Sequence, residues 1–215
     1  MSVTSIIFDC DGTLVDSEGI GVDVIVELAA EHGAQLDRDV EARELRGLKL
    51  AECVSGIEAR SGVALPDTFI PEIRVRTAAA FRQRLQAMPG IHELLSSLRV
   101  PYCVASSAPR EKTELSLSLT GLLRFFEGRI FSSYEVGSWK PEPGLFLHAA
   151  QTMGFTPESC AVIEDSEPGV AAGLAAGMQV FAFGFTPDAR PQAESVRVVR
   201  DHFELRAALA AEPPA

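Results

Sequence analysis

Hydrophobic and polar positions along this chain follow two alternating patterns. Short apolar runs rich in β-branched residues, each bounded by polar or turn-forming residues, predict buried strands. Apolar residues repeated every three or four positions predict helices. Strands are predicted over residues 5–8, 102–105, 129–131, 161–163 and 180–183, and the helices that alternate with them over residues 92–98, 111–119, 144–153 and 169–176. This alternation predicts an α/β fold, a Rossmann-like parallel sheet core with helices on both faces.

One stretch interrupts the alternation directly after the first strand. Residues 17–84 contain no convincing strand, and helices are predicted there over residues 21–32, 39–46, 50–60 and 71–85. Breaks fall near Gly33, Gly47 and Gly62, where glycine favours the end of a helix. A helical segment at this place indicates an inserted domain. We therefore expect a core of residues 1–15 and 89–215 and an all-helical cap domain of residues 16–88.

Composition and charge narrow the choice of partners. The chain has 215 residues, 47% of them hydrophobic, which is enough for a sizeable core. Its 19 Lys and Arg residues against 30 Asp and Glu residues give a net charge of −11, which repels nucleic acids and anionic membrane surfaces. No apolar run approaches the ~18 residues of a membrane helix, and the N-terminus lacks the basic region of a secretory signal. We expect a cytoplasmic protein without nucleic-acid or membrane partners, a monomer or a weak dimer.

Cysteine and histidine residues are dispersed and form no metal-binding pattern. Cys10, Cys53, Cys103 and Cys160 include no C-x-x-C pair, so we expect reduced, mostly buried thiols and no structural zinc site. The four histidines are expected in packing or surface positions; they are His32, His92, His148 and His202.

Polar residues with possible chemistry follow four of the predicted strands. Ligands of an open parallel sheet bind beyond the carboxyl ends of its strands, so these segments are expected at one edge of the sheet. The segments are Asp9-Cys10-Asp11-Gly12-Thr13, Ser106-Ser107, Trp139-Lys140-Pro141 and Glu164-Asp165.

Carboxylates dominate this predicted edge. Asp9 and Asp11 lie two positions apart and leave the strand on the same side, with Cys10 turned away. Glu164 and Asp165 add two more acids, and four crowded carboxylates raise one another's pKa unless a cation lies among them. Oxygen ligands without His or Cys favour Mg²⁺, which shares its coordination with phosphate.

Each of these segments also has an ordinary structural interpretation. Asp-x-Asp-Gly is common in turns, Ser106-Ser107 is typical of a helix cap, and Glu164-Asp165 suits the start of the next helix. Lys140 alone is typical of a solvated surface lysine. Their order along the chain, each beyond a strand end, favours a common site.

The residues from Asp9 to Ser17, together with Ser106, Lys140 and Glu164-Asp165, resemble motifs one to four of the haloacid dehalogenase superfamily. The resemblance covers nearly the whole chain and includes the helical cap, as in the β-phosphoglucomutase-like branch. Residues 46–50, 139–143 and 146–150 are similar to those of bacterial phosphatases of sugar-acid phosphates. The resemblance implies a Mg²⁺-dependent phosphatase acting on a small phosphorylated metabolite, a sugar or sugar-acid phosphate.

The resemblance also implies a role for each matching residue. Asp9 would attack phosphorus and form an aspartyl-phosphate, and Asp11 would protonate the leaving alcohol and later deprotonate water. Mg²⁺ would be held by Asp9, the Asp11 carbonyl and Asp165, and Glu164 would lie beside them. Lys140 would offset negative charge and Ser106 would bind the transferring phosphoryl group.

Further residues are expected to contact substrate. Backbone N–H groups near Gly12, with Thr13 and Ser107 nearby, would surround the phosphate, and the cap would contribute Glu18, Arg46 and Lys49. Arg110, on the core side, would reach a second anionic group. The alternative that these charges are simply solvated stays open.

Four alternatives are weighed against hydrolysis of a phosphate ester. Asp11 favours phosphate esters over carbon–halogen or carbon–phosphorus bonds, although Lys49 resembles the imine-forming lysine of phosphonoacetaldehyde hydrolases. Gly21 and Leu50 replace residues expected of a sugar-phosphate mutase. A phospho-receiver module would carry an aspartate after the third strand, where this chain has Ser132-Ser133-Tyr134, and a metabolite-binding module would show no turnover.

Overall fold

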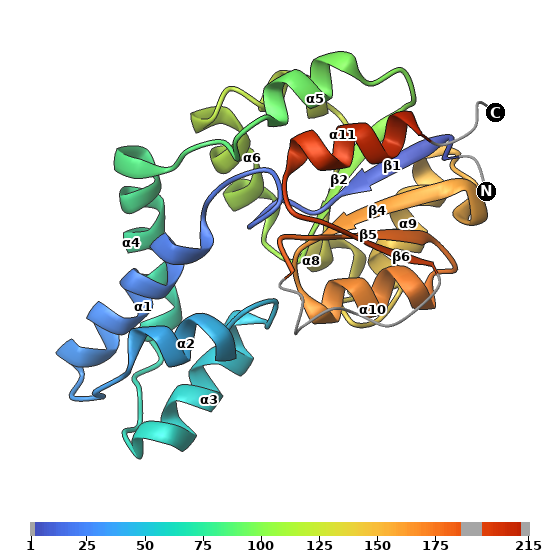
Figure 1. The fold of residues 1–215 in the computed structure, drawn as a ribbon. Helices are drawn as coiled ribbons and strands as arrows, with labels where there is room; N and C mark the ends of the chain where they lie inside the picture. The colour runs from blue at the N-terminus through green and yellow to red at the C-terminus, as the bar shows by residue number, and fades with distance from the viewer. Residues whose placement is uncertain (1–2, 186–194, 212–215) are drawn as a thin grey trace.

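The computed structural model describes residues 3–185 and 195–211, and a six-stranded parallel sheet lies at its centre. The strands lie in the order β3-β2-β1-β4-β5-β6 (Figure 1). Their bounds are Ser5–Phe8 (β1), Tyr102–Ser106 (β2), Ile130–Ser132 (β3), Cys160–Glu164 (β4), Gln179–Phe183 (β5) and Val196–Val199 (β6). This is the predicted Rossmann-like core, with every strand paired in parallel to its neighbours.

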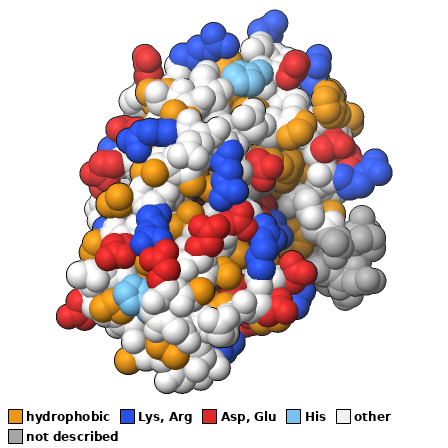
Figure 2. Space-filling view, turned by 90° about the vertical axis from the view of Figure 1, so that its left-hand side faces the viewer, with side chains coloured by type: hydrophobic (Ala, Val, Ile, Leu, Met, Phe, Trp, Pro, Cys, Tyr) orange, Lys and Arg blue, Asp and Glu red, His pale blue; other side chains and the backbone are white. Residues whose placement is uncertain are grey.

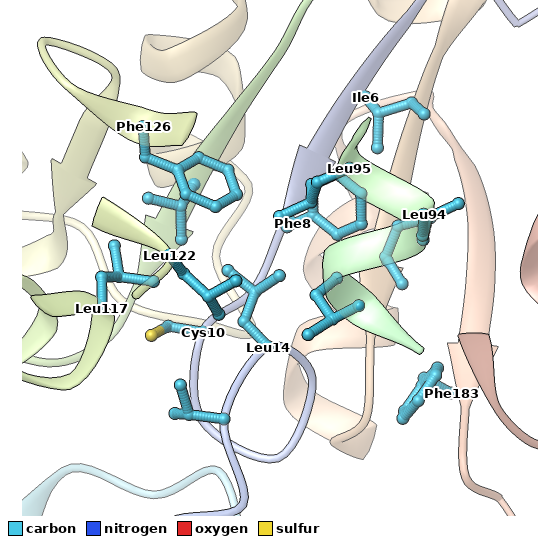
Figure 3. Close-up of a cluster of buried hydrophobic side chains, with 14 of the residues drawn as sticks. Ile6, Phe8, Cys10, Leu14, Leu94, Leu95, Leu117, Leu122, Phe126 and Phe183 are labelled. Atoms are coloured by element: carbon cyan, nitrogen blue, oxygen red, sulfur yellow. The ribbon is translucent and has the colours of Figure 1, made fainter. Parts of the chain in front are cut away.

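Helices cover both faces of the sheet, because alternate strand residues point to opposite sides. Ile6 and Phe8 pack with α5, α6 and α11 in one hydrophobic cluster, and Cys10 also lies there (Figure 3). Ile7 packs with α9 and α10 in a second cluster. The elements of the core are α5 (Ile91–Ser97), α6 (Arg110–Leu119), α7 (Leu123–Phe126), α8 (Ser133–Val136), α9 (Gly144–Met153), η1 (Pro157–Ser159), α10 (Glu167–Ala175) and α11 (His202–Ala210).

The first four of the helices between β1 and β2 form a lobe beside the sheet, towards which the carboxyl ends of β1 and β4 point (Figure 1). They are α1 (Glu18–Glu31), α2 (Arg38–Glu44), α3 (Leu50–Ser61) and α4 (Phe69–Arg84). The lobe has a hydrophobic cluster of its own, which includes Leu28, Ile57 and Phe69. A buried Glu41 carboxylate, 2.5 Å from the Arg60 guanidinium, ties α2 to α3.

The predicted elements are present with bounds shifted by a few residues. Helix α4 begins at Phe69 and accommodates Pro71 in its first turn, where a backbone N–H has no intrahelical partner. Five of the described elements were not predicted: β6, α7, α8, η1 and α11. Strand β6 is short and at the edge, and the exposed Arg197 interrupts its apolar residues, while α7 and α8 are single turns of four residues.

The expectations for cysteine and membrane segments can be compared with the structure directly. All four cysteines are free and buried. Within residues 3–185 and 195–211, none of the helices combines the length and apolar character needed to span a bilayer.

Candidate active site

The candidate site lies where β1 and β4 end side by side. From β1 the chain continues to β2 and β3 on one side of the sheet, and from β4 it continues to β5 and β6 on the other. The boundary between β1 and β4 is therefore the topological switch point, where ligands bind in open α/β sheets. Phe8 is in register with Ile163, and the Asp9 amide donates to the Ile163 carbonyl at 2.9 Å. Asp9 therefore leaves β1 directly beside Glu164, the last residue of β4.

Lys140 joins the two acids at this strand pair. Its ammonium donates to one carboxylate oxygen of Asp9 and to one of Glu164, and all three side chains are nearly buried. Burial raises the pKa of Asp9 well above its usual value, and the charge of Lys140 only partly opposes this. Burial also disfavours a charged Lys140, but Asp9 and Glu164 outweigh it and raise the pKa of the ammonium.

Glu164 is held by its neighbours as well as by Lys140. Its second carboxylate oxygen accepts from the Ser166 amide at 3.0 Å and from the Ser166 hydroxyl at 2.9 Å. Gly169 packs so closely that a Cβ there would overlap the Glu164 carboxylate. The start of α10 therefore encloses Glu164.

Asp11 has a different pair of partners. The Ser17 hydroxyl donates to its Oδ1 at 2.6 Å, and the Lys112 ammonium donates to its Oδ2, also at 2.6 Å. Burial would raise the pKa of Asp11, but the Lys112 charge and the two hydrogen bonds outweigh it and hold the pKa below its usual value. Lys112 was not among the predicted site residues. Its only sequence signal is its place in the first turn of the helix that follows β2.

Asp165 is one of the core residues that the helical lobe contacts. Arg46, in the segment between α2 and α3, lies 2.8 Å from the Asp165 carboxylate and 3.0 Å from that of Glu18. The pKa of Asp165 is raised, first by burial and then by Glu164 and Glu18, with Arg46 opposing the shift. Gly47, at φ +74°, lies against Ser166, where a Cβ would approach the Ser166 Cβ to 2.9 Å.

The core and the helical lobe together line a cavity of about 660 Å³. Asp9, Asp11, Lys140 and Asp165 line it together with apolar residues that include Val22 and Phe81. The face of the molecule that carries the helical lobe intersperses acidic and basic side chains without a large patch of one sign (Figure 2).

Most of the predicted substrate contacts lie at this cavity. Ser106, Ser107, Glu18, Arg46 and Lys49 all line it. The Ser106 hydroxyl also accepts from the Ala108 amide at 3.1 Å, but the N-cap of α6 is Pro109, so Ser106 does not cap that helix. The Lys49 ammonium lies 4.5 Å from the centroid of the Trp139 ring.

Three of the predicted contacts are placed differently. Gly12 lies against Asp165, where a Cβ would approach Oδ2 to 2.2 Å, so its place permits close packing of the loop. Thr13 is fully buried and does not line the cavity. The Arg110 guanidinium is bound by Glu135 at 2.5 and 2.6 Å and by the Ile130 carbonyl at 2.7 Å, outside the cavity lining.

Protein cations, and not only a metal, compensate the four acids. Lys140, Lys112 and Arg46 lie among them, so these side chains would share the compensation with a bound divalent ion. In the part of the chain that the structure describes, no three His, Cys, Asp or Glu side chains are grouped as a metal site. The remaining oxygens, from Asp9, the Asp11 main chain and Asp165, are the hard donors that suit Mg²⁺.

Comparisons with known proteins agree with one another. A family model for haloacid dehalogenase-like hydrolases matches residues 3–177. The chain is 36% identical over 190 residues to 6-phosphogluconate phosphatase of Escherichia coli K12, covering 88% of this chain and 86% of that protein.

Two solved structures are similar over nearly their whole length. One is a haloacid dehalogenase family hydrolase of Deinococcus radiodurans R1 with bound phosphate and sodium, at 34% identity, 99% coverage of both chains and a TM-score of 0.78. The other is a conserved haloacid dehalogenase-like protein of unknown function from Agrobacterium tumefaciens C58, at 28% identity, coverage of 98% and 99%, and a TM-score of 0.83.

Proposed function

Because the chain belongs to the haloacid dehalogenase-like hydrolase family, we propose that it hydrolyses the phosphate ester of a small metabolite. The named phosphatase among its relatives supports a phosphoric monoester hydrolase. The observation that carries the proposal is that Asp9 and Asp11 line the same cavity, each bound to its own lysine. The two carboxylates therefore lie at one cavity, where a nucleophile and a proton donor are both needed.

The proposed reaction divides the chemistry between these two residues. The Asp9 carboxylate attacks phosphorus, the phosphorus–oxygen bond to the alcohol breaks, and Asp11 gives the leaving oxygen its proton. In the second half, Asp11 takes a proton from water, which attacks the aspartyl-phosphate and breaks its bond to Asp9. Inorganic phosphate leaves, and both aspartates return to their starting states.

The surrounding residues stabilise charge and position the phosphoryl group. Lys140 stays beside Asp9 and offsets the negative charge that gathers there, while Ser106 is available to donate to a phosphoryl oxygen. Asp9, the Asp11 main-chain carbonyl and Asp165 would hold Mg²⁺. When bound, this ion neutralises charge on the phosphate.

The helical lobe would act as a cap that selects the substrate. We assign the catalytic core to residues 1–15 and 89–215 and the cap to residues 16–88. Lys49 and Arg46, both at the cavity, would suit a carboxylate on the leaving group, and the name of the Escherichia coli relative supports a sugar-acid phosphate such as 6-phosphogluconate. The cytoplasmic location of the protein stays a prediction, and so does its state as a monomer or weak dimer.

One alternative keeps a specific observation in its favour. Lys49, on which a phosphonoacetaldehyde-hydrolase-like reaction would depend, lines the cavity. Borohydride trapping of an imine at Lys49 would favour that reaction.

The test is a panel of phosphorylated metabolites assayed for release of inorganic phosphate, with Mg²⁺ and with a chelator. We expect sugar or sugar-acid phosphates to be hydrolysed only with the metal. Asp9→Asn is expected to lower kcat by at least ~10³-fold because the nucleophile is lost. Full activity of this variant, or activity that survives chelation unchanged, would overturn the mechanism.

A further inference from the structure

The Lys112 ammonium is positioned at the proposed proton donor and not at the proposed nucleophile. It lies 2.6 Å from Asp11 Oδ2, while Ser17 holds Oδ1 at the same distance. Both oxygens of the carboxylate are therefore fixed by partners from separate segments of the chain. One partner alone would leave the carboxylate free to turn about its Cβ–Cγ bond.

The position of Lys112 is not that of an ordinary solvated surface lysine. Lys112 lies in the first turn of α6, where the helix dipole disfavours a cation unless an acid compensates it. Its side chain is 35% exposed and lines the cavity, and its ammonium also lies 5.6 Å from the Phe81 ring. Among the described residues, Asp11 is the sole hydrogen-bond acceptor of this ammonium, so its other donors remain available to the cavity.

The two partners of Asp11 belong to different lobes. Ser17 directly precedes α1, the first helix of the cap, and a movement of the cap would carry it along. Helix α6 is anchored in the core through Leu117, which is fully buried in the same cluster as Phe8. Lys112 is therefore the partner that stays with Asp11 when the cap moves.

We propose that Lys112 is a positioning residue that keeps the Asp11 carboxyl group directed at the leaving-group oxygen. The inference rests on the proposed phosphatase function. Lys112 takes part in no bond change: Asp11 still gives its proton to the leaving oxygen as the phosphorus–oxygen bond breaks. Lys112 acts by limiting the orientations of Asp11 from which that transfer is possible.

This role has a signature that a purely structural role lacks. An alkyl alkoxide is a poor leaving group and needs the proton from Asp11, whereas p-nitrophenolate leaves without it. Impaired positioning of Asp11 therefore lowers kcat/KM for alkyl phosphates and leaves it nearly unchanged for p-nitrophenyl phosphate. A damaged fold, or lost binding of the phosphoryl group itself, lowers both values together.

The experiment compares the wild type, Lys112→Met, Lys112→Arg and Asp11→Asn on two esters. The esters are the alkyl phosphate that the wild type hydrolyses fastest in the panel and p-nitrophenyl phosphate. We expect Lys112→Met to lower kcat/KM by about 30-fold for the alkyl ester and by less than about threefold for the aryl ester. Asp11→Asn should show the same split more strongly, and Lys112→Arg should recover most of the loss.

Arg124→Met is the matched control, since it removes an exposed cation of α7 that lies outside the cavity lining. It should leave both values unchanged, and circular dichroism should show every variant folded. If the wild type is active and Lys112→Met loses kcat/KM equally on both esters, or loses none on the alkyl ester, this inference alone is overturned. A wild type that hydrolyses neither ester would overturn the proposed function, and this inference with it.

Discussion

Lys140 and Asp9, 131 residues apart in the sequence, form a buried ion pair beyond the carboxyl end of β1. The same ammonium is bound to Glu164, so two buried carboxylates depend on one cation. A buried charge whose partner is removed costs far more than the intact pair contributes, because the remaining charge has no solvent to stabilise it.

Lys140→Met is therefore expected to lower the free energy of unfolding by about 3 kcal/mol. Urea denaturation followed by circular dichroism measures this change. The double variant Lys140→Met/Glu164→Gln should lose less than the single variant, because one of the two unpaired carboxylates is gone. A single variant as stable as the wild type would show that the ion pair does not support the fold.

His202 is expected to make the protein less stable in mild acid. Its ring is buried beside Phe183, its Nδ1 lies 3.2 Å from the Pro89 carbonyl, and burial lowers its pKa to about 4. The unfolded chain binds a proton near pH 6.5 and the folded chain near pH 4, so the stability contributed above pH 6.5 is lost as the pH falls through this window. The loss approaches about 3 kcal/mol.

A comparison of pH profiles isolates the contribution of this group. We subtract the free energy of unfolding of His202→Gln from that of the wild type at each pH. This difference should decrease as the pH is lowered from 6.5 to 4. The difference removes the contributions of Asp9 and Asp165, which titrate in both proteins. A difference that is flat across this range would contradict the burial argument.

The ion pair between Glu41 and Arg60 provides a test of whether the cap is a separate unit. Arg60→Met leaves the Glu41 carboxylate, 2% exposed, without its partner, and should destabilise the cap by about 2 kcal/mol. Hydrogen exchange should accelerate in α2 and α3 and stay unchanged in β1 and β4. The exposed Arg43 of α2 offers the control Arg43→Met, and equal acceleration in the core strands would argue against an independent cap.

The success and failure of the sequence predictions have physical reasons. Asp9 and Asp165 could be found because each directly follows a buried apolar strand, and the ends of parallel strands converge on one edge. Lys140 could be found because it lies in the segment that leads from the third strand to the next helix. Lys112 could not, because its relation to Asp11 depends on where a helix surface faces after packing. Arg110, two residues earlier on the same helix, turns to Glu135 instead, and no local pattern distinguishes the two side chains.

The sequence also could not predict which cations neutralise the carboxylates of the site. Counting acids along the chain shows how many carboxylates meet but not which cations reach them. Arg46 comes from a cap segment 119 residues before Asp165, and only the folded chain brings them together. β6 was missed for another reason: Arg197 interrupts this short edge strand, which therefore lacks the continuous apolar run that identified the central strands.

Gly47 is expected to control how closely the cap approaches the core. It adopts φ +74°, and a Cβ at this position would come within 2.9 Å of the Ser166 Cβ and 3.3 Å of Pro168. Gly62, also in the cap, adopts φ +69°, but a Cβ there would have no neighbouring atom within 4 Å, so its substitution introduces backbone strain without a collision. Both Gly→Ala changes should cost about 1 kcal/mol of stability from that strain.

The two variants should differ in what happens at the cavity. Gly47→Ala pushes the segment that carries Arg46 and Lys49 away from Ser166, so we expect a KM raised by about tenfold and a larger radius of gyration in X-ray scattering. Gly62→Ala should leave both quantities unchanged. If the two variants behave alike, the contact between Gly47 and Ser166 does not govern the approach of the cap, because backbone strain is the one effect that they share.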